Sequence, residues 1–219
     1  MRHTILSSAL KAIAIFGTPK FSIKDVARIA GVSPASVYYY FGSRQNLHKE
    51  TVEQYFFPLF RRIGAAVREL PDVMELLVEI FRIIQSACES DTNFFWLYAN
   101  MTFHERFTLR DMPAYCLPEF QPRLRERLAE AQENGELNPD LILELTYHSA
   151  ISSALFSTGC IENWGKFWGK RFDKRKARDH FLYAFCRAAE GPRCAYPWRE
   201  ILFPDGPPAA PAGAWGGGG

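Results

Sequence analysis

The chain has 219 residues, 47% of them apolar and 23% charged, which is enough for one large or two small globular domains with a sizeable core. None of its five cysteines belongs to a CxxC pair and no run of 18 apolar residues occurs, which argues against a secreted disulfide scaffold and against a membrane span. The apolar stretch at the start is interrupted by Lys11 and repeats with helical period, so we expect no signal peptide. These features predict a cytoplasmic protein with no membrane partner.

Positive charge is concentrated near the N-terminus. The net charge of the whole chain is only +2, but residues 1–50 hold seven Lys or Arg against two acids and carry +5. The remaining residues together carry −3. A basic first segment on an acidic body is typical of a piece that meets a polyanion, because Lys and Arg neutralise phosphates.

The first two helices are expected over 4–16 and 23–30. Apolar residues recur in the first segment at spacings of three and four, which places them on one face of a helix. The second segment follows Ser22, a residue type that caps helix N-termini, and has Asp25 in its first turn. Gly31 then suits the left-handed position at which many helices stop.

A third short helix is expected over 33–41. Ser33 caps it, and Pro34 takes the first turn, where a missing N–H costs nothing. Gly42 ends this helix, and a longer one is expected from 43 to about 67. Two short helices joined at a glycine make a helix-turn-helix, whose second helix enters the major groove of DNA.

The rest of the chain also follows helical patterns. No alternating strand pattern of convincing length and no internal repeat occurs, so we expect an all-α fold. Pro58 falls inside the long helix and should kink it or divide it in two. The Pro-, Gly- and Ala-rich residues 206–219 cannot bury much surface and are expected to form a disordered tail. Further helices are expected over 73–89, 93–102, 104–111, 119–134, 140–162 and 175–190.

Three consecutive tyrosines, Tyr38–Tyr40, occupy the third helix and cannot all face one core. On a helix, Val37 and Phe41 lie one turn apart and face inward, whereas the tyrosines spread over the other faces. Such rings suit a DNA groove, because their hydroxyls can donate to phosphate oxygens and their edges can touch thymine methyls. The alternative is that some of them are ordinary half-buried surface residues.

The segment FSIKDVARIAGVSPASVYYYFGSRQNL resembles the DNA-binding segment of the TetR family of transcriptional regulators. The matching features are the Ser-x-x-Asp-Val-Ala opening, Ala-Gly-Val-Ser, the hydrophobe-Tyr-Tyr-x-Phe core and the following Ser-Arg-x-x-Leu. The resemblance implies an N-terminal three-helix helix-turn-helix domain over 1–50 and a C-terminal helical ligand-binding and dimerisation domain over 51–205. It also implies a homodimer that binds a palindromic operator in double-stranded DNA.

The resemblance further implies which residues contact DNA. Arg44 matches a phosphate-binding basic position, and Tyr40 stands where the family very often has His. The basic N-terminal arm that some members use to reach the minor groove is missing. The family contacts fall on Ser22, Lys24, Ser33, Pro34, Ala35, Ser36, Tyr38, Tyr39, Tyr40 and Arg44.

A ring-rich segment, NFFWLYANMTFHERF at 93–107, indicates where a small ligand could bind. Helical bodies with many aromatic residues often enclose an apolar pocket with a few polar groups. The alternative is a solid aromatic core without a cavity. The candidate ligand-binding residues are Trp96, Met101, Phe103, His104, Tyr147, His148 and Ser152.

Two segments in the last third of the chain offer faces for a dimer contact. The faces consist of Ala150, Ser153, Ala154 and Ser157, and of Phe181, Ala184, Phe185 and Ala188. Two such helices from each subunit would form a four-helix interface, and the resemblance places the dimer contact in this region. The alternative is an ordinary core within one chain.

Enzyme motifs fail when they are checked residue by residue. His104-Glu105 begins an HExxH motif, but Thr108 takes the place of the second His. Cys and His do not cluster at metal-ligand spacing, so we expect no catalytic residue, no metal and no cofactor. The basic stretch KFWGKRFDKRKAR at 166–178 is read as a solvated loop and helix start, with nucleic-acid binding as the alternative.

The sequence therefore predicts a TetR-like transcriptional regulator that acts as a repressor and is released from its operator by a small apolar or aromatic effector. One alternative is a DNA-binding dimer without such an inducer, controlled by a protein partner. Another is an enzyme with an appended DNA-binding domain, for which the sequence offers no catalytic constellation.

Overall fold

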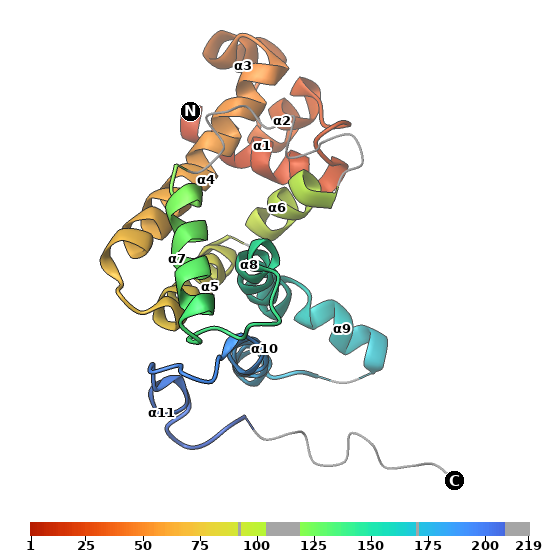
Figure 1. The fold of residues 1–219 in the computed structure, drawn as a ribbon. Coiled ribbons are helices and arrows are strands. Elements are labelled where there is room, and N and C mark those ends of the chain that lie inside the picture. The colour runs from red at the N-terminus through yellow and green to blue at the C-terminus, as the bar shows by residue number, and fades with distance from the viewer. Residues whose placement is uncertain (92, 104–118, 170, 209–219) are drawn as a thin grey trace. The chain divides into compact units, whose positions relative to one another are not determined.

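The computed structural model describes residues 1–91, 93–103, 119–169 and 171–208 (Figure 1). All regular elements of these residues are helices, which confirms the all-α prediction, and their only β-type pairing is an isolated bridge between Leu137 and Glu190. None of the helices in these ranges is long and apolar enough to cross a bilayer. The helices are α1 (Arg2–Phe16), α2 (Ile23–Ala30), α3 (Pro34–Phe41), α4 (Arg44–Glu69), α5 (Val73–Ser90), α6 (Asn93–Phe103), α7 (Gln121–Glu133), α8 (Leu143–Gly159), α9 (Ile161–Trp168), α10 (Lys174–Ala189) and α11 (Trp198–Leu202).

The helices group into two compact units. The first unit comprises Met1–Ala65 and Ser86–Gln121, and the second comprises Ala66–Gln85 and Pro122–Gly219. Both α4 and α5 contribute residues to each unit. The division by function into 1–50 and 51–205 stays a prediction, because compactness groups helices by packing and not by what they bind.

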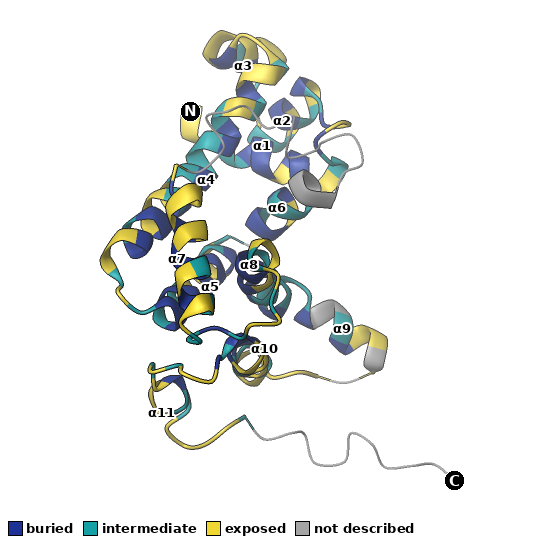
Figure 2. Ribbon diagram, viewed as in Figure 1, coloured by how far each residue is buried: buried dark blue, intermediate teal, exposed yellow. Residues whose placement is uncertain are grey.

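The helix-turn-helix part of the first unit is built on the apolar faces of α1, α2 and α3. Ile5 and Ile13 of α1, Val26 of α2 and Val37 of α3 are fully buried, and Phe41 is 2% exposed. Figure 2 shows these helices buried on their inner sides and exposed on their outer sides. The three-helix arrangement predicted for the N-terminus is therefore present, with α1 packed against α2 and α2 against α3.

A second set of contacts in the first unit joins α4 and α6. The Phe56 ring of α4 lies 5.3 Å from the Phe94 ring and 6.3 Å from the Tyr98 ring, measured between centroids. Helix α6 also packs against α1. The ring-rich segment thus begins as a buried helix that is attached directly to the helix-turn-helix.

The second unit is organised around α8 and α10, which pack against each other. Ala150 and Ala154 of α8 and Phe185 of α10 are all buried. Trp198 of α11 is fully buried and stands edge-on to the Tyr183 ring of α10, with 5.4 Å between ring centroids. The core of this unit therefore uses part of the face that we predicted for dimer contact.

The single helix predicted over 140–162 is wrong, because α8 begins only at Leu143 and ends at Gly159. Asn138, in the segment before α8, bonds to the end of α10. Its amide Nδ2 donates to the Ala188 carbonyl at 3.1 Å, and its backbone N–H donates to the Ala189 carbonyl at 2.9 Å. These bonds tie the segment to the end of α10, so it turns before it becomes helical.

Other boundaries also differ from the sequence-based expectation. Helix α9 follows α8 after a break at Cys160, and α11 was not predicted at all. Helix α4 continues through Pro58, so the long helix is not divided there. The helix predicted over 104–111 and the tail residues from 209 onward lie outside the described ranges.

Candidate nucleic-acid interface

The start of α2 is fixed by a reciprocal pair of hydrogen bonds. The Asp25 backbone N–H donates to the Ser22 hydroxyl at 3.2 Å, and the Ser22 backbone N–H donates to the Asp25 carboxylate at 3.1 Å. The Ser22 hydroxyl itself donates to that carboxylate at 2.6 Å, and this bond is the main cause that lowers the pKa of Asp25. Such a capping box satisfies N–H groups that the helix cannot. Ser22 is therefore occupied within the chain, whereas Lys24 beside it is exposed.

The turn between α2 and α3 needs a glycine. Gly31 ends α2 with a φ of 67°, in the left-handed region, which side-chain-bearing residues rarely adopt. Ser33 then caps α3, because its hydroxyl accepts the Ser36 backbone N–H at 3.1 Å. Pro34 occupies the first turn of α3, and Pro34 and Ala35 are exposed. Small exposed residues at the start of α3 permit a close approach to another molecule.

The three consecutive tyrosines of α3 face away from the core. Tyr39 is 84% exposed, Tyr38 is 52% exposed and Tyr40 is 38% exposed. The Tyr39 and Tyr40 rings meet edge to face with 5.3 Å between centroids. Since Val37 and Phe41 fill the core side of the same helix, packing alone does not account for the outward rings.

Arg44 is held inside the first unit. Its Nε donates to the Phe21 carbonyl at 2.8 Å, its Nη2 donates to the Thr18 carbonyl, and its guanidinium lies over the Phe21 ring at 4.4 Å. The residue therefore joins the start of α4 to the connection between α1 and α2. A contact between Arg44 and a DNA phosphate stays a prediction. In such a contact the guanidinium would bond to the phosphate and to the two carbonyls at the same time.

Arg2 is a connecting residue that the sequence analysis did not single out. Its guanidinium pairs with the Glu50 carboxylate of α4 and lies 5.1 Å from the centre of the Phe41 ring of α3. The residue thus links the start of α1 to both helices that flank the candidate interface. Helical periodicity does not mark this role, because the partners are distant in sequence.

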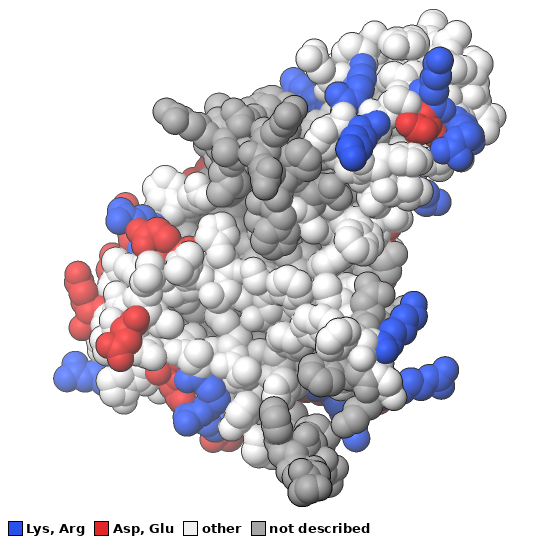
Figure 3. All heavy atoms as spheres, turned by 90° about the vertical axis from the view of Figure 1, so that its right-hand side faces the viewer, with Lys and Arg blue, Asp and Glu red and all other residues white. Residues whose placement is uncertain are grey.

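Positive charge surrounds the exposed side of the helix-turn-helix. Lys20, Lys24 and Arg28 are exposed, and the Asp25 carboxylate lies 3.4 Å from Arg28 as a partial counter-charge. Figure 3 shows Lys and Arg side chains gathered on the part of the surface formed by this domain. The arrangement presents outward rings and cations on the same domain, which is what a phosphate-lined groove requires.

His48 is a half-buried histidine next to this domain's packing contacts. Its ring lies 6.1 Å from the Phe21 ring, and burial together with the nearby Arg44 charge lowers the pKa of His48 from 6.5 to about 4. The unfolded chain therefore takes up a proton near pH 6.5, whereas the folded chain does not until the pH approaches 4. Stability from this site is fully present above pH 6.5 and is lost as the pH falls.

We expect the free energy of unfolding to fall by about 1.4 kcal/mol per pH unit between pH 6.5 and about pH 4 because of His48. Urea denaturation across this range measures the slope. His48→Phe should flatten it, whereas His3→Gln, at an exposed position, should leave it unchanged. Equal slopes in the wild type and His48→Phe would contradict the assignment.

The residues predicted to bind a ligand fall in both units. Trp96 of α6 is 45% exposed, whereas Tyr147 of α8 is buried and Ser152 is half-buried. His148 is half-buried, and burial lowers its pKa. Of the remaining candidates, the side chains of Met101 and Phe103 and all of His104 lie outside what the structure describes.

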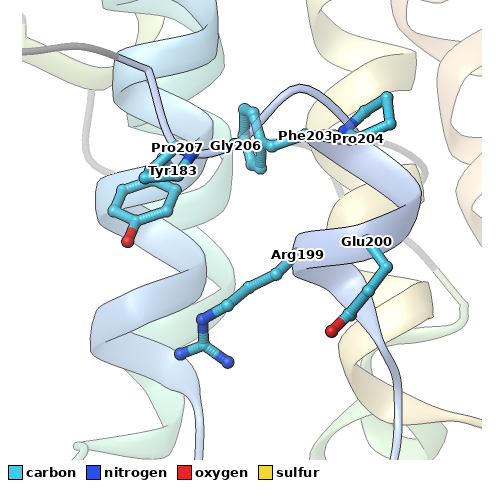
Figure 4. A pocket seen from close by; sticks show the side chains of 7 residues that line it. All are labelled: Tyr183, Arg199, Glu200, Phe203, Pro204, Gly206 and Pro207. Carbon is cyan, nitrogen blue, oxygen red and sulfur yellow. The ribbon is translucent and has the colours of Figure 1, made fainter.

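Two of the clefts are lined by described residues such as Arg2 and Tyr183, and none of the ligand candidates lines either of these two. In the first unit a polar cleft of about 340 Å³ lies between α1 and α4, beside Arg2, Lys49 and Glu50. In the second unit a cleft of about 410 Å³ is lined by Tyr183 of α10, by Arg199 of α11 and by residues between Glu200 and Pro207. Figure 4 shows Tyr183 and Arg199 on facing sides of this cleft.

The charge in the α10–α11 cleft is already paired. Both Nη atoms of Arg199 donate to the Glu190 carboxylate, and the guanidinium lies 4.3 Å from the centre of the Trp198 ring. The pair lowers the pKa of Glu190, chiefly through this hydrogen bonding. Across the described ranges, no group of three His, Cys, Asp or Glu side chains could hold a metal ion.

Residues 5–51 match the family model for bacterial regulatory proteins of the TetR family. The HTH-type transcriptional regulator BetI of Agrobacterium fabrum is 34% identical over 82 residues, which are 37% of this chain and 40% of BetI. The HTH-type transcriptional repressor KstR2 of Mycolicibacterium smegmatis is 24% identical over 151 residues, which are 67% of this chain and 72% of KstR2. The match to BetI thus spans less than half of that relative.

The fold is also shared with solved structures. The transcriptional regulator FadR of Bacillus subtilis, solved in complex with stearoyl-CoA, aligns with a TM-score of 0.60 at 17% sequence identity. The alignment covers 86% of this chain and 99% of FadR. At this identity the likeness shows the fold alone. Residues 5–51 thus form a helix-turn-helix that matches the TetR family of bacterial regulatory proteins, and the helical body that carries it shares the fold of the solved regulators.

Proposed function

We propose that the chain is a repressor that binds a palindromic operator in double-stranded DNA as a homodimer and leaves it when a small, largely apolar or aromatic ligand binds. The observation that carries the proposal is the split of α3 into two faces. Val37 and Phe41 are buried, whereas Tyr39 is 84% exposed beside exposed cations. This outward face suits the major groove, where a recognition helix lies with its N-terminal part against base edges.

We expect different residues to contact the phosphates and the bases of the duplex. The outward tyrosine hydroxyls and Lys24 suit phosphate oxygens, which position the protein but carry no sequence information. The short side chains of Ala35 and Ser36 at the start of α3 let the backbone approach the bases, where a serine hydroxyl can bond to a base edge. Ser22 and Ser33 act on the DNA mainly by holding α2 and α3 in place, because their hydroxyls cap those helices.

The ligand would act by shifting a population between two arrangements of the dimer. Operator binding requires the two copies of α3 to reach successive major grooves, which lie about 34–36 Å apart. A ligand that binds better to an arrangement with a different separation weakens operator binding by its difference in affinity. Helix α6 supports such coupling, because it carries Trp96 and packs directly against α1.

The class of ligand is suggested by the named relatives. FadR of Bacillus subtilis was solved with stearoyl-CoA, a molecule with a long apolar chain. The aromatic contacts of Phe56 with Phe94 and Tyr98 show that α4 and α6 form ring-rich surroundings in the first unit. We therefore favour a ligand with a sizeable apolar part. Trp96 is the described candidate in the first unit, and Tyr147, His148 and Ser152 are the described candidates in the second unit.

The dimer contact is proposed for the outward faces of α8 and α10. Ala150, Ala154 and Phe185 are buried within one chain, so we no longer include them in the proposed dimer interface. Ala184 and Ala188 of α10 are exposed, and so is Leu145 of α8, at 56%. A small-residue stripe on α10 beside an exposed leucine permits close packing with a second copy.

Ala184→Arg is expected to convert the dimer into a monomer, because a bulky charge would be buried against the same charge of the second copy. We expect the dissociation constant of the dimer to rise by about a hundredfold or more. Sedimentation equilibrium measures it. The matched control is Ala195→Arg, the same change at an exposed position outside these helices. A dimer that tolerates Ala184→Arg would place the contact elsewhere.

The whole proposal is tested by recovering the genomic fragments that the purified protein retains. We expect fragments that share a palindrome, with half-sites separated by about one helical turn. Stearoyl-CoA, a shorter acyl-CoA and an aromatic acid are then added to test release. Random recovery of fragments would contradict operator binding, and retention under all three compounds would favour the alternative of control by a protein partner.

A further inference from the structure

Exposed rings and positive charge occur together where α9 ends and α10 begins. Phe167, in the last turn of α9, is 79% exposed, and Phe172, in the connection to α10, is 42% exposed. Gly169 ends α9 with a φ of 62°, and Lys174 begins α10. Large apolar side chains on a surface are informative when they gather beside charge of a single sign.

Positive charge exceeds negative charge in this segment. Both acidic residues of 166–179 accept hydrogen bonds from residues of α10. The Asp173 carboxylate accepts the Lys176 backbone N–H at 2.9 Å, and the Asp179 carboxylate accepts the Arg178 Nε–H at 3.0 Å. We call the described residues of 166–179 the basic tip. Its six cations are Lys166, Arg171, Lys174, Arg175, Lys176 and Arg178.

The helix that leads into the basic tip, α9, packs against α8 and α10. The Trp164 ring of α9 stacks on the Phe156 ring of α8 with 6.0 Å between centroids and an interplanar angle of 9°. On its other side it stacks on the Phe181 ring of α10 with 5.8 Å between centroids. The Trp164 ring of α9 is therefore used in packing, whereas the Phe167 ring one turn further along the same helix remains exposed.

The residue types of the tip decide between partners. Residues 166–179 contain no Asn, Gln, Ser or Thr, so Lys and Arg are the only side chains there that could bond to base edges as well as to phosphates. A duplex would use the cations alone and leave the phenyl rings in water. An anionic lipid surface uses both, because rings enter the boundary between headgroups and acyl chains while Lys and Arg meet the headgroup phosphates.

We propose that the basic tip docks this protein on anionic lipid surfaces. The docking is peripheral, so it requires no membrane-spanning helix, and it revises the expectation of no membrane partner that rested on the absence of a span. Phe167 and Phe172 supply the apolar contact, and Lys166, Arg171 and Lys176 supply the charge. The proposal is independent of operator binding, which uses α3 in the first unit.

The test is co-sedimentation of the full chain with vesicles of phosphatidylcholine containing about one third phosphatidylglycerol. We expect binding to these vesicles, none to pure phosphatidylcholine, and release at high salt, because surface charges are screened. Lys166→Gln/Arg171→Gln/Lys176→Gln should weaken binding by about a hundredfold. Phe167→Ser/Phe172→Ser should weaken it by about tenfold or more at unchanged charge.

Two control variants distinguish binding through the basic tip from nonspecific adsorption to vesicles. Arg61→Gln/Arg62→Gln/Arg68→Gln removes three exposed cations elsewhere, and Ile142→Ser/Ile201→Ser removes two exposed apolar side chains. Both should bind vesicles like the wild type. The proposal is overturned if the wild type does not sediment or if a control loses as much binding as the tip variants. It is also overturned if the tip variants change only the binding of non-operator duplex or only the monomer–dimer equilibrium.

Discussion

Tyr39→Ala/Tyr40→Ala is expected to abolish retention of the operator in a gel-shift assay. The two rings stand outward on α3 and pack mainly on each other, so their removal takes away contacts to DNA and little of the core. Loss of two contacts worth about 1–3 kcal/mol each weakens binding by about thirtyfold or more. The measurement is titration of a recovered genomic fragment at fixed salt, since affinity for DNA depends strongly on ionic strength.

The double variant must remain folded for this result to carry weight. Substitutions at exposed positions usually change stability by less than about 0.5 kcal/mol, so its circular dichroism spectrum and sedimentation should match the wild type. Trp96→Ala serves as the control, because it removes a half-exposed ring from the same unit outside α3. If the double variant retains the fragment as well as the control does, α3 is not the recognition helix.

Arg127→Met is expected to cost the second unit about 3 kcal/mol of stability. Arg127 of α7 is 7% exposed, its Nη1 donates to the Val67 carbonyl at 2.8 Å, and its Nη2 donates to the Pro71 carbonyl at 2.7 Å. The Val67 carbonyl belongs to the last turn of α4, where a helix leaves carbonyls without partners of its own. Methionine keeps similar length but supplies no donor, so two acceptors lose bonds to a charged group.

Urea denaturation of the full chain measures this cost as a lower transition midpoint. Arg125→Met is the matched control, since Arg125 lies on the same helix with its side chain 73% exposed and pairs with the exposed Glu144. Exposed ion pairs contribute little, so this control should stay within about 1 kcal/mol of the wild type. Arg127→Lys should fall between the two, because one ammonium cannot reproduce the planar fork. Equal midpoints for Arg127→Met and Arg125→Met would show that the two carbonyl contacts do not stabilise the unit.

The helix-turn-helix could be predicted almost residue by residue. Helix α2 spans the predicted 23–30, Ser22 and Ser33 are caps, and Gly31 takes the left-handed conformation. Each of these features depends on residues within one or two turns of each other, so the residue order alone specifies it. The outward position of Tyr39 followed in the same way, from its angle on the helix relative to Val37.

The candidate sites were harder to predict, because their geometry depends on partners that are distant in sequence. Nothing local to Arg44 shows that its guanidinium joins two carbonyls before α2, and nothing local to Arg2 shows its place between Glu50 and Phe41. Only packing of α8 on α10 shows that Ala154 belongs to the core. The small-residue face was visible in the sequence, but its partner was not.

The sequence by itself determined the helix-turn-helix, the candidate recognition helix and the face of that helix that points outward, because caps, turns and helical periodicity are local properties. Only the tertiary structure decided where the 140–162 segment turns, that α11 buries Trp198, and that a basic tip with exposed rings stands beside α10. Those outcomes depend on which surfaces are left uncovered after distant helices have packed. That choice is made by the free energy of the whole core and not by any single segment.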